Sequence, residues 1–121
     1  MVTPEQRRGY RAGWQRYREQ RKRDLAKRYQ QAMERARAAA EHLKEQYGCR
    51  VFLFGSMLRK DRFMKHSDID IAVLGLDSLI NFWKLYSEVM DILAPFDFDL
   101  IELEKVDHEM RESILKEGIE L

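Results

Sequence analysis

The segment Asp68–Gly75 reads Asp-Ile-Asp-Ile-Ala-Val-Leu-Gly, and its first half alternates carboxylates with branched apolar side chains. Side chains on a strand point to opposite faces in turn, so Asp68 and Asp70 share one face while Ile69 and Ile71 lie on the other. Carboxylates are costly to bury without a partner. The segment therefore predicts a strand that fills a core with one face and carries two acids at an exposed end of the other.

A long helix is predicted for the N-terminal part of the chain. Thr3-Pro4-Glu5 has the order of a helix start, with a capping hydroxyl, a proline and then an acid in the first turn. Apolar residues recur at steps of three and four as far as Tyr47, and Gly48 is a typical helix stop. Because Arg21 interrupts this apolar stripe, one unbroken helix and a break near residues 20–25 both stay open.

Shorter elements are predicted for the rest of the chain. Apolar, β-rich runs predict three strands, at residues 50–55, 68–75 and 97–103. Helical spacing predicts three helices, at residues 56–60, 77–93 and 107–116, with Asp77-Ser78 as the cap of the second. The order favours an α/β (α+β) fold, a small mixed sheet packed by helices. Core positions are expected at Trp83, Met110, Ile114 and Leu115.

Length and composition describe one domain with an appendage. The chain has 121 residues, and its net charge of +1 hides an asymmetry. Residues 1–50 hold 14 Lys/Arg against 6 Asp/Glu, whereas residues 51–121 hold 8 against 15. The single cysteine, Cys49, excludes an internal disulfide and a Cys/His zinc pattern. No signal peptide or membrane-spanning run is evident, so a soluble cytoplasmic protein is expected.

A cluster of acids is expected where two strands begin. Asp97 and Asp99 share a face of the third strand by the same alternation that joins Asp68 and Asp70. If the strands pair with matching ends, three or four carboxylates converge, and their repulsion raises one another's pKa. A divalent cation removes this conflict, and ligands that are all oxygen select Mg²⁺ or Mn²⁺.

Gly55-Ser56 lies between the first predicted strand and a predicted helical turn. The glycine allows close approach of the backbone to a ligand, and the serine hydroxyl and helical amides suit a phosphate. Basic side chains of the following loop would offset triphosphate charge: Arg59, Lys60, Arg62 and Lys65. Alone, Gly-Ser or Asp-X-Asp is an ordinary turn feature. Together with a third, acid-bearing strand they indicate a site.

The stretch FLFGSMLRKDRFMKHSDIDIAV, followed by FDFDLIEL, resembles the minimal nucleotidyltransferases of the polymerase-β-type superfamily. Their signature is hydrophobic-Gly-Ser, about ten residues, Asp-X-Asp and a third acid on a later strand. The spacer here is one residue longer than the commonest form, and Lys60 replaces a frequent glycine. The resemblance implies a palm-like fold at residues 31–121, with residues 1–30 as a basic, aromatic helical extension.

The same resemblance assigns roles to individual residues. It makes Asp68, Asp70 and Asp99 the catalytic, metal-binding carboxylates, with Asp97 as an alternative for the third. It implies two Mg²⁺ ions, with Mn²⁺ as an alternative, and ATP as substrate. The nucleotide-binding residues would be Gly55, Ser56, Arg59 and Lys65.

The implied activity is transfer of AMP from ATP to a protein hydroxyl. Small members of this family often pair with a HEPN protein as antitoxin, so a HEPN-type toxin or another protein acceptor is the expected partner. A non-catalytic antitoxin that acts by complex formation, and an RNA nucleotidyltransferase, are the alternatives. The segment Arg16–Arg28 could bind nucleic acid. A homodimer or partner contact through this helix, with Tyr10, Trp14 and Tyr17 in the interface, is the preferred interpretation.

Overall fold

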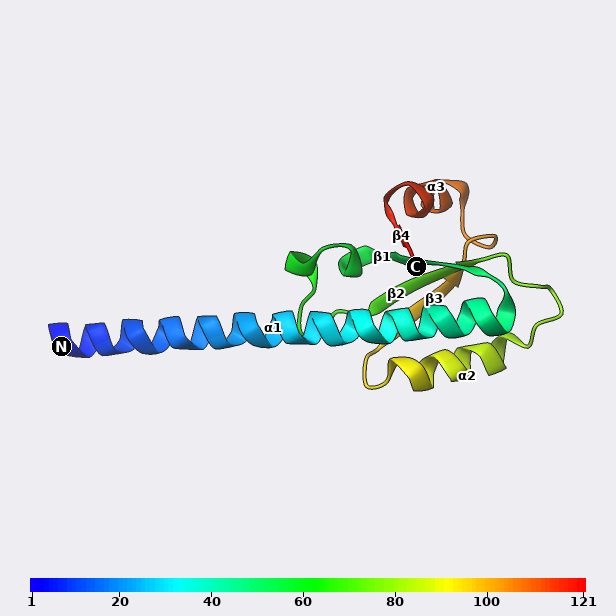
Figure 1. Ribbon diagram of the computed structural model, residues 1–121. Helices are drawn as coiled ribbons and strands as arrows, with labels where there is room; N and C mark the ends of the chain where they lie inside the picture. Colours follow the sequence, from blue (N-terminus) through cyan, green and yellow to red (C-terminus); the bar gives the residue numbers. More distant parts are fainter.

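The computed structural model describes residues 1–121 as three helices and a four-stranded sheet (Figure 1). The helices are α1 (Pro4–Tyr47), α2 (Phe82–Leu93) and α3 (His108–Glu117). The strands are β1 (Arg50–Phe54), β2 (Ile69–Leu74), β3 (Phe98–Glu102) and β4 (Ile119–Glu120). Two short 3₁₀ helices, η1 (Gly55–Leu58) and η2 (Lys60–Arg62), follow β1. The predicted mixed sheet packed by helices is confirmed.

Helix α1 is continuous over 44 residues, which settles the question of a break near residues 20–25. Thr3 caps it through a hydrogen bond that its hydroxyl accepts from the backbone N–H of Gln6, and the Gln6 side chain returns the contact. At the other end Gly48 adopts φ 65° and donates its N–H to the carbonyl of Lys44. The helix therefore starts and ends where its sequence signals predict.

The sheet has the strand order β3-β2-β1-β4. β1 pairs antiparallel with β2 and with β4, whereas β2 and β3 run parallel. The parallel pair places Ile69 beside Phe98 and Asp70 beside Asp99. The N-terminal ends of β2 and β3 therefore meet at the same edge as the C-terminal end of β1.

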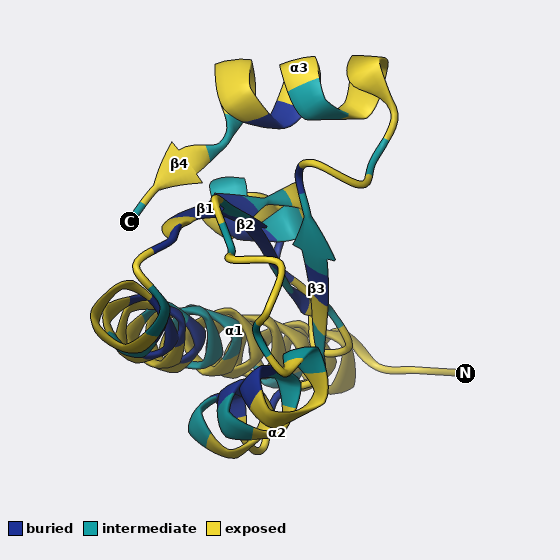
Figure 2. Ribbon diagram, turned by 90° about the vertical axis from the view of Figure 1, so that its right-hand side faces the viewer, coloured by how far each residue is buried: buried dark blue, intermediate teal, exposed yellow.

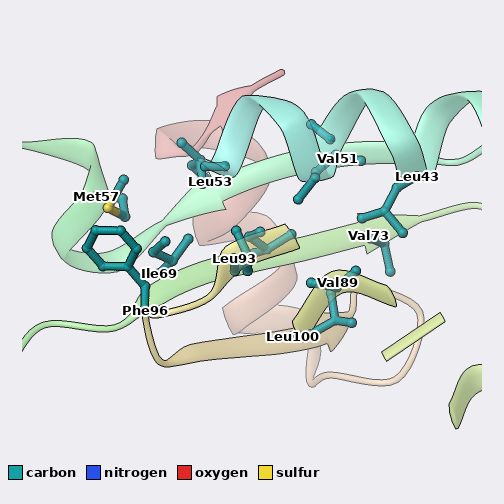
Figure 3. Close-up of a cluster of buried hydrophobic side chains, with 14 of the residues drawn as sticks. Leu43, Val51, Leu53, Met57, Ile69, Val73, Val89, Leu93, Phe96 and Leu100 are labelled. Carbon is teal, nitrogen blue, oxygen red and sulfur yellow. The ribbon is translucent and has the colours of Figure 1, made fainter. Parts of the chain in front are cut away.

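The two faces of the sheet are covered by different helices, and Figure 2 shows α3 on one side with α1 and α2 on the other. The larger core lies on the side of α1 and α2, where Leu43, Leu53, Val73 and Val89 are fully buried (Figure 3). The opposite face is only partly covered, because α3 contributes one buried residue, Ile114. No helix is long and apolar enough to cross a membrane.

Several details differ from the sequence-based expectations. Trp83 is not in the core but 76% exposed, because the inner face of α2 is formed by Leu85, Val89 and Leu93. Met110 and Leu115 are likewise exposed, and of the predicted inward positions on α3 only Ile114 is buried.

The start of α2 and the last strand were also missed. Asn81 caps α2 with its side chain, whereas Asp77 closes the preceding turn by accepting from the N–H of Leu79. Strand β4 has two residues and exists through its pairing with β1, which no local pattern predicts.

Candidate functional site

The predicted acids meet at the edge where β2 and β3 begin. Asp70 and Asp99 are paired neighbours on the parallel strands, and the same register puts Phe54 of β1 on the other side of Asp70. Asp68 immediately precedes β2 and is exposed, as is Asp99, while Asp70 is half-buried. Alternation puts all three carboxylates on the side of the sheet that α3 covers only in part.

Gly55 lies directly against this acidic group. It adopts φ 68°, a conformation that other residues rarely take. A Cβ at this position would lie 2.1 Å from Oδ2 of Asp70 and 3.1 Å from its Cγ. The glycine is therefore needed both for the turn into η1 and for the space that the Asp70 carboxylate occupies.

The Asp70 carboxyl is electrostatically strained. Burial, together with the negative charges of Asp99 and Asp68, raises its pKa to about 6. The repulsion expected from the sequence is thus present at the residue between the other two. Near neutral pH an opposite charge at this edge would relieve it.

The donor set fits a hard divalent cation. All three side chains offer carboxylate oxygens, the ligands that Mg²⁺ and Mn²⁺ prefer. No three acidic, histidine or cysteine side chains lie close enough as they stand to hold a metal ion. Asp68 and Asp99 are exposed, so their side chains have room to change rotamer toward an ion.

Ser56 opens onto a groove between η1 and α3. The groove has a volume of about 810 Å³ and combines the end of β1 with one side of α3. Gly55, Ser56 and Arg62 line it on one side, and Ser113 and Asp107 lie on the other. The α3 residues were not among the predicted nucleotide-binding residues, because only the tertiary fold brings α3 over this turn. Arg62 is one of the loop cations that were expected to offset triphosphate charge.

Of the four loop cations expected to offset triphosphate charge, only Arg62 lines this groove. Arg59 forms a two-pronged ion pair with Asp61 and faces α1, where it lines a second groove with Lys22 and Phe63. Lys65 is exposed beside α1. The structure therefore brings together Gly55, Ser56, Asp68, Asp70 and Asp99, and it leaves Arg59 and Lys65 at the margin.

Asp97 takes a different position from Asp99. It precedes β3 and is exposed, and its backbone carbonyl accepts the N–H of Ile69. The charges that raise the pKa of Asp70 are those of Asp99 and Asp68. Asp97 therefore lies at the margin of the group of acids around Asp70.

Tyr29 of α1 contacts the Gly55–Leu58 turn, and no sequence pattern indicated this role. Its hydroxyl donates a hydrogen bond of 3.0 Å to the carbonyl of Met57 within η1, and its ring packs edge-on against Phe63 at 5.6 Å. The helix that forms the core thereby also supports the Gly55–Leu58 turn.

Comparison with known proteins gives one matching family. The family model described as polymerase beta, nucleotidyltransferase matches residues 40–121, which include the whole acidic edge and the Gly-Ser turn. No curated protein matches this chain.

Solved structures with the same fold include toxin–antitoxin complexes. A crystal structure of the toxin-antitoxin MntA-HepT is 25% identical over 73% of this chain and 69% of that one, with a TM-score of 0.52. A toxin-antitoxin with AMP-PNP is 27% identical over 69% of each chain, with a TM-score of 0.55. A mutant of the toxin-antitoxin is 26% identical over 66% of each, with a TM-score of 0.52. The chain thus spans about two thirds of the length of these proteins.

Proposed function

This chain belongs to the polymerase β nucleotidyltransferase family, and we propose that it transfers AMP from ATP to a protein hydroxyl as the antitoxin of a toxin–antitoxin pair. The observation that carries the proposal is the edge where Asp70 lies between Asp99 and Asp68, with Gly55 against it. A similar MntA-HepT structure supports a HEPN-type toxin as partner, and a similar toxin-antitoxin structure with the ATP analogue AMP-PNP supports the choice of nucleotide.

We assign Asp68, Asp70 and Asp99 as ligands of two Mg²⁺ ions, with Mn²⁺ as an alternative. The reason is the donor set and the raised pKa of Asp70, which a cation at this edge would bring back down. Bound Mg²⁺ supplies neutralisation of the triphosphate charge and a lower pKa for the acceptor hydroxyl.

The chain's own groups would then bind and orient the reactants. Gly55, Ser56 and Arg62 line the groove, and a glycine backbone, a serine hydroxyl and a guanidinium all suit phosphates. Arg59 and Lys65, at the margin of the site, would attract the triphosphate from a greater distance.

In the transfer step the acceptor oxygen bonds to the α-phosphorus as the bond from that phosphorus to the bridging oxygen breaks. Pyrophosphate leaves with the electron pair of the broken bond. A carboxylate oxygen of Asp99, exposed at the strand edge, receives the proton of the acceptor hydroxyl. AMP remains on the acceptor as a phosphodiester.

The test uses ATP labelled at the α-phosphate, the purified chain, Mg²⁺ and a HEPN-type toxin. Label on the toxin is expected with the native chain and not with Asp68→Ala, Asp70→Ala or Asp99→Ala. ATP labelled at the γ-phosphate should leave no label on the toxin, which separates nucleotidyl from phosphoryl transfer. Asp91→Ala removes an exposed carboxylate of α2 and should transfer normally. Full neutralisation of the toxin by the three aspartate variants would instead identify a non-catalytic antitoxin.

A further inference from the structure

The first half of α1 extends beyond the sheet and the other two helices. We name Pro4–Asp24 the arm, and Figure 1 shows it projecting away from the sheet and the other helices. Its aromatic side chains are open to solvent, because Tyr10, Trp14 and Tyr17 expose 69%, 57% and 55% of their surface. The rings of Trp14 and Tyr17 stack at 5.6 Å, and the Arg18 guanidinium lies 5.7 Å from the Trp14 ring. A surface of this kind indicates a binding partner.

The arm's charges are sorted by face. The arm holds eight arginine or lysine residues and three carboxylates, Glu5, Glu19 and Asp24. At 3.6 residues per turn, an arc of roughly 140° contains all three aromatic residues, five cations and no carboxylate. We name this arc the basic aromatic face: Arg7, Tyr10, Arg11, Trp14, Tyr17, Arg18, Arg21 and Lys22. The three carboxylates all lie on the rest of the helix.

The basic aromatic face continues the side of α1 that is buried in the domain. Ala32, Ala36, Ala39 and Leu43 are buried and fall in the same arc of the helix. A ligand on the arm therefore lies on the same side of α1 as the sheet, beyond its edge at β2 and β3.

A groove links the arm to the loop before the catalytic acids. It has a volume of about 520 Å³ and is lined by Tyr17, Gln20, Arg21, Asp24, Leu25, Arg28 and Lys65, three cations against one carboxylate. The buried Nε of Arg28 has no hydrogen-bond partner. Lys65 belongs to the loop that precedes β2, three residues before Asp68 along the chain.

We propose that the basic aromatic face binds single-stranded RNA, which runs along the arm toward the groove at Lys65. Exposed aromatic rings stack on unpaired bases, and surrounding cations neutralise phosphates. Tyr10, Trp14 and Tyr17 are separated by about 6 Å and 4.5 Å along the helix axis, within reach of successive nucleotides. Pairing this face with the arm of a second copy would oppose five cations to five, which disfavours self-association. The proposal holds whatever group accepts the nucleotide.

The test measures binding of a fluorescein-labelled, mixed-sequence single-stranded RNA to the full chain, with the RNA duplex as competitor. The double variant Trp14→Ala/Tyr17→Ala should weaken binding about tenfold or more, because stacking is lost. Arg11→Glu/Arg18→Glu should weaken binding further. It should also reduce the magnitude of the slope of log affinity against log salt concentration by about 1.4, because two phosphate contacts are lost. RNA should also quench the fluorescence of Trp14 in a Trp83→Phe background.

Two control variants keep the same residue types outside the basic aromatic face. Arg35→Glu/Arg37→Glu reverses two exposed charges on the domain half of α1, and Trp83→Ala removes an exposed aromatic ring from α2. Both should bind RNA as the native chain does. Equal losses in arm and control variants, or preference for duplex, would overturn the proposal. So would a native dimer that the arm variants convert to monomer while RNA binding is unchanged.

Discussion

The carboxylate of Asp70 packs so closely against the backbone of Gly55 that a side chain at position 55 would clash with it. A Cβ on Gly55 would lie 2.1 Å from Oδ2 of Asp70. One residue starts the turn proposed to hold phosphates, and the other is the central acid of the edge. Movement of either would therefore displace the other. This contact couples the proposed phosphate-binding turn to the proposed metal ligands.

Gly55→Ala should disrupt the site more than the fold. The positive φ of 68° costs alanine about 1–2 kcal/mol, and the contact with Asp70 forces the turn or the carboxylate to shift. A displacement of this kind should reduce nucleotidyl transfer by about 100-fold. Gly48→Ala is the matched control, because Gly48 has φ 65° and open space around its Cβ position. It should lose similar stability in thermal unfolding and keep its activity; equal activity of the two variants would contradict the coupling.

Stability without metal should depend on pH through Asp70. Folding raises the pKa of this carboxyl from 3.8 to about 6, so its stabilising contribution is complete below about pH 4 and is lost as pH rises through 6. Asp70→Asn, which carries no charge, should unfold at a higher temperature than the native chain at about pH 7.5 in EDTA. The gain should be about 1 kcal/mol at this half-exposed group, or roughly 4 °C.

Near pH 4 the same substitution should have little effect, because the native carboxyl is then protonated as well. Thermal unfolding of both chains across this pH range is the measurement. A constant difference between native and Asp70→Asn chains at every pH would show that shape, and not charge, accounts for it.

Mg²⁺ should stabilise the native chain, and removal of the ion should abolish transfer. An ion that binds only the folded state raises the unfolding temperature, and the increase grows with the ratio of the Mg²⁺ concentration to its dissociation constant. The increase should be larger at about pH 7.5 than at about pH 5, because a proton on Asp70 competes with the ion. Calorimetry with and without EDTA tests this. An increase of the same size in Asp70→Asn would place the ion elsewhere.

Asp99 and Asp97 should differ in their effect on activity. Asp99 is the strand partner of Asp70, whereas Asp97 lies outside β3 and is not among the charges that raise the pKa of Asp70. Asp99→Asn should therefore reduce transfer about 100-fold or more. Asp97→Asn should retain activity within about threefold. Rates with α-labelled ATP decide the point, and the reverse ranking would make Asp97 the third ligand.

The sequence predicted the acidic edge well because its signals are local. The alternation of side chains in β2 determines which face Asp68 and Asp70 occupy, and Gly55 directly follows β1. A strand period of two residues and a single turn glycine were therefore sufficient to predict this part of the site. The pairing of Asp70 with Asp99 required only that the two strands begin at the same edge.

What the sequence missed depends on contacts between distant segments. Trp83 is large and apolar, as core residues usually are, yet it is exposed. Single apolar side chains on the surface are common, and the neighbouring sequence does not reveal which ones are exposed. The groove at Ser56 needs α3 to fold back over η1, and Tyr29 meets Met57 across 28 positions of sequence. The continuity of α1 through Arg21 could not be predicted either. This part of the helix does not pack on the core, so its apolar pattern is not required to be regular.

Tyr29→Phe should weaken the turn without disturbing the core. The phenylalanine ring keeps the edge contact with Phe63 and loses only the 3.0 Å hydrogen bond to the Met57 carbonyl, which should cost about 1 kcal/mol. Because this carbonyl belongs to η1, KM for ATP should rise a fewfold while kcat changes little. Tyr10→Phe removes a hydroxyl from the exposed arm and should alter neither value. Unchanged KM with reduced stability would show that Tyr29 supports the fold and not the phosphate-binding turn.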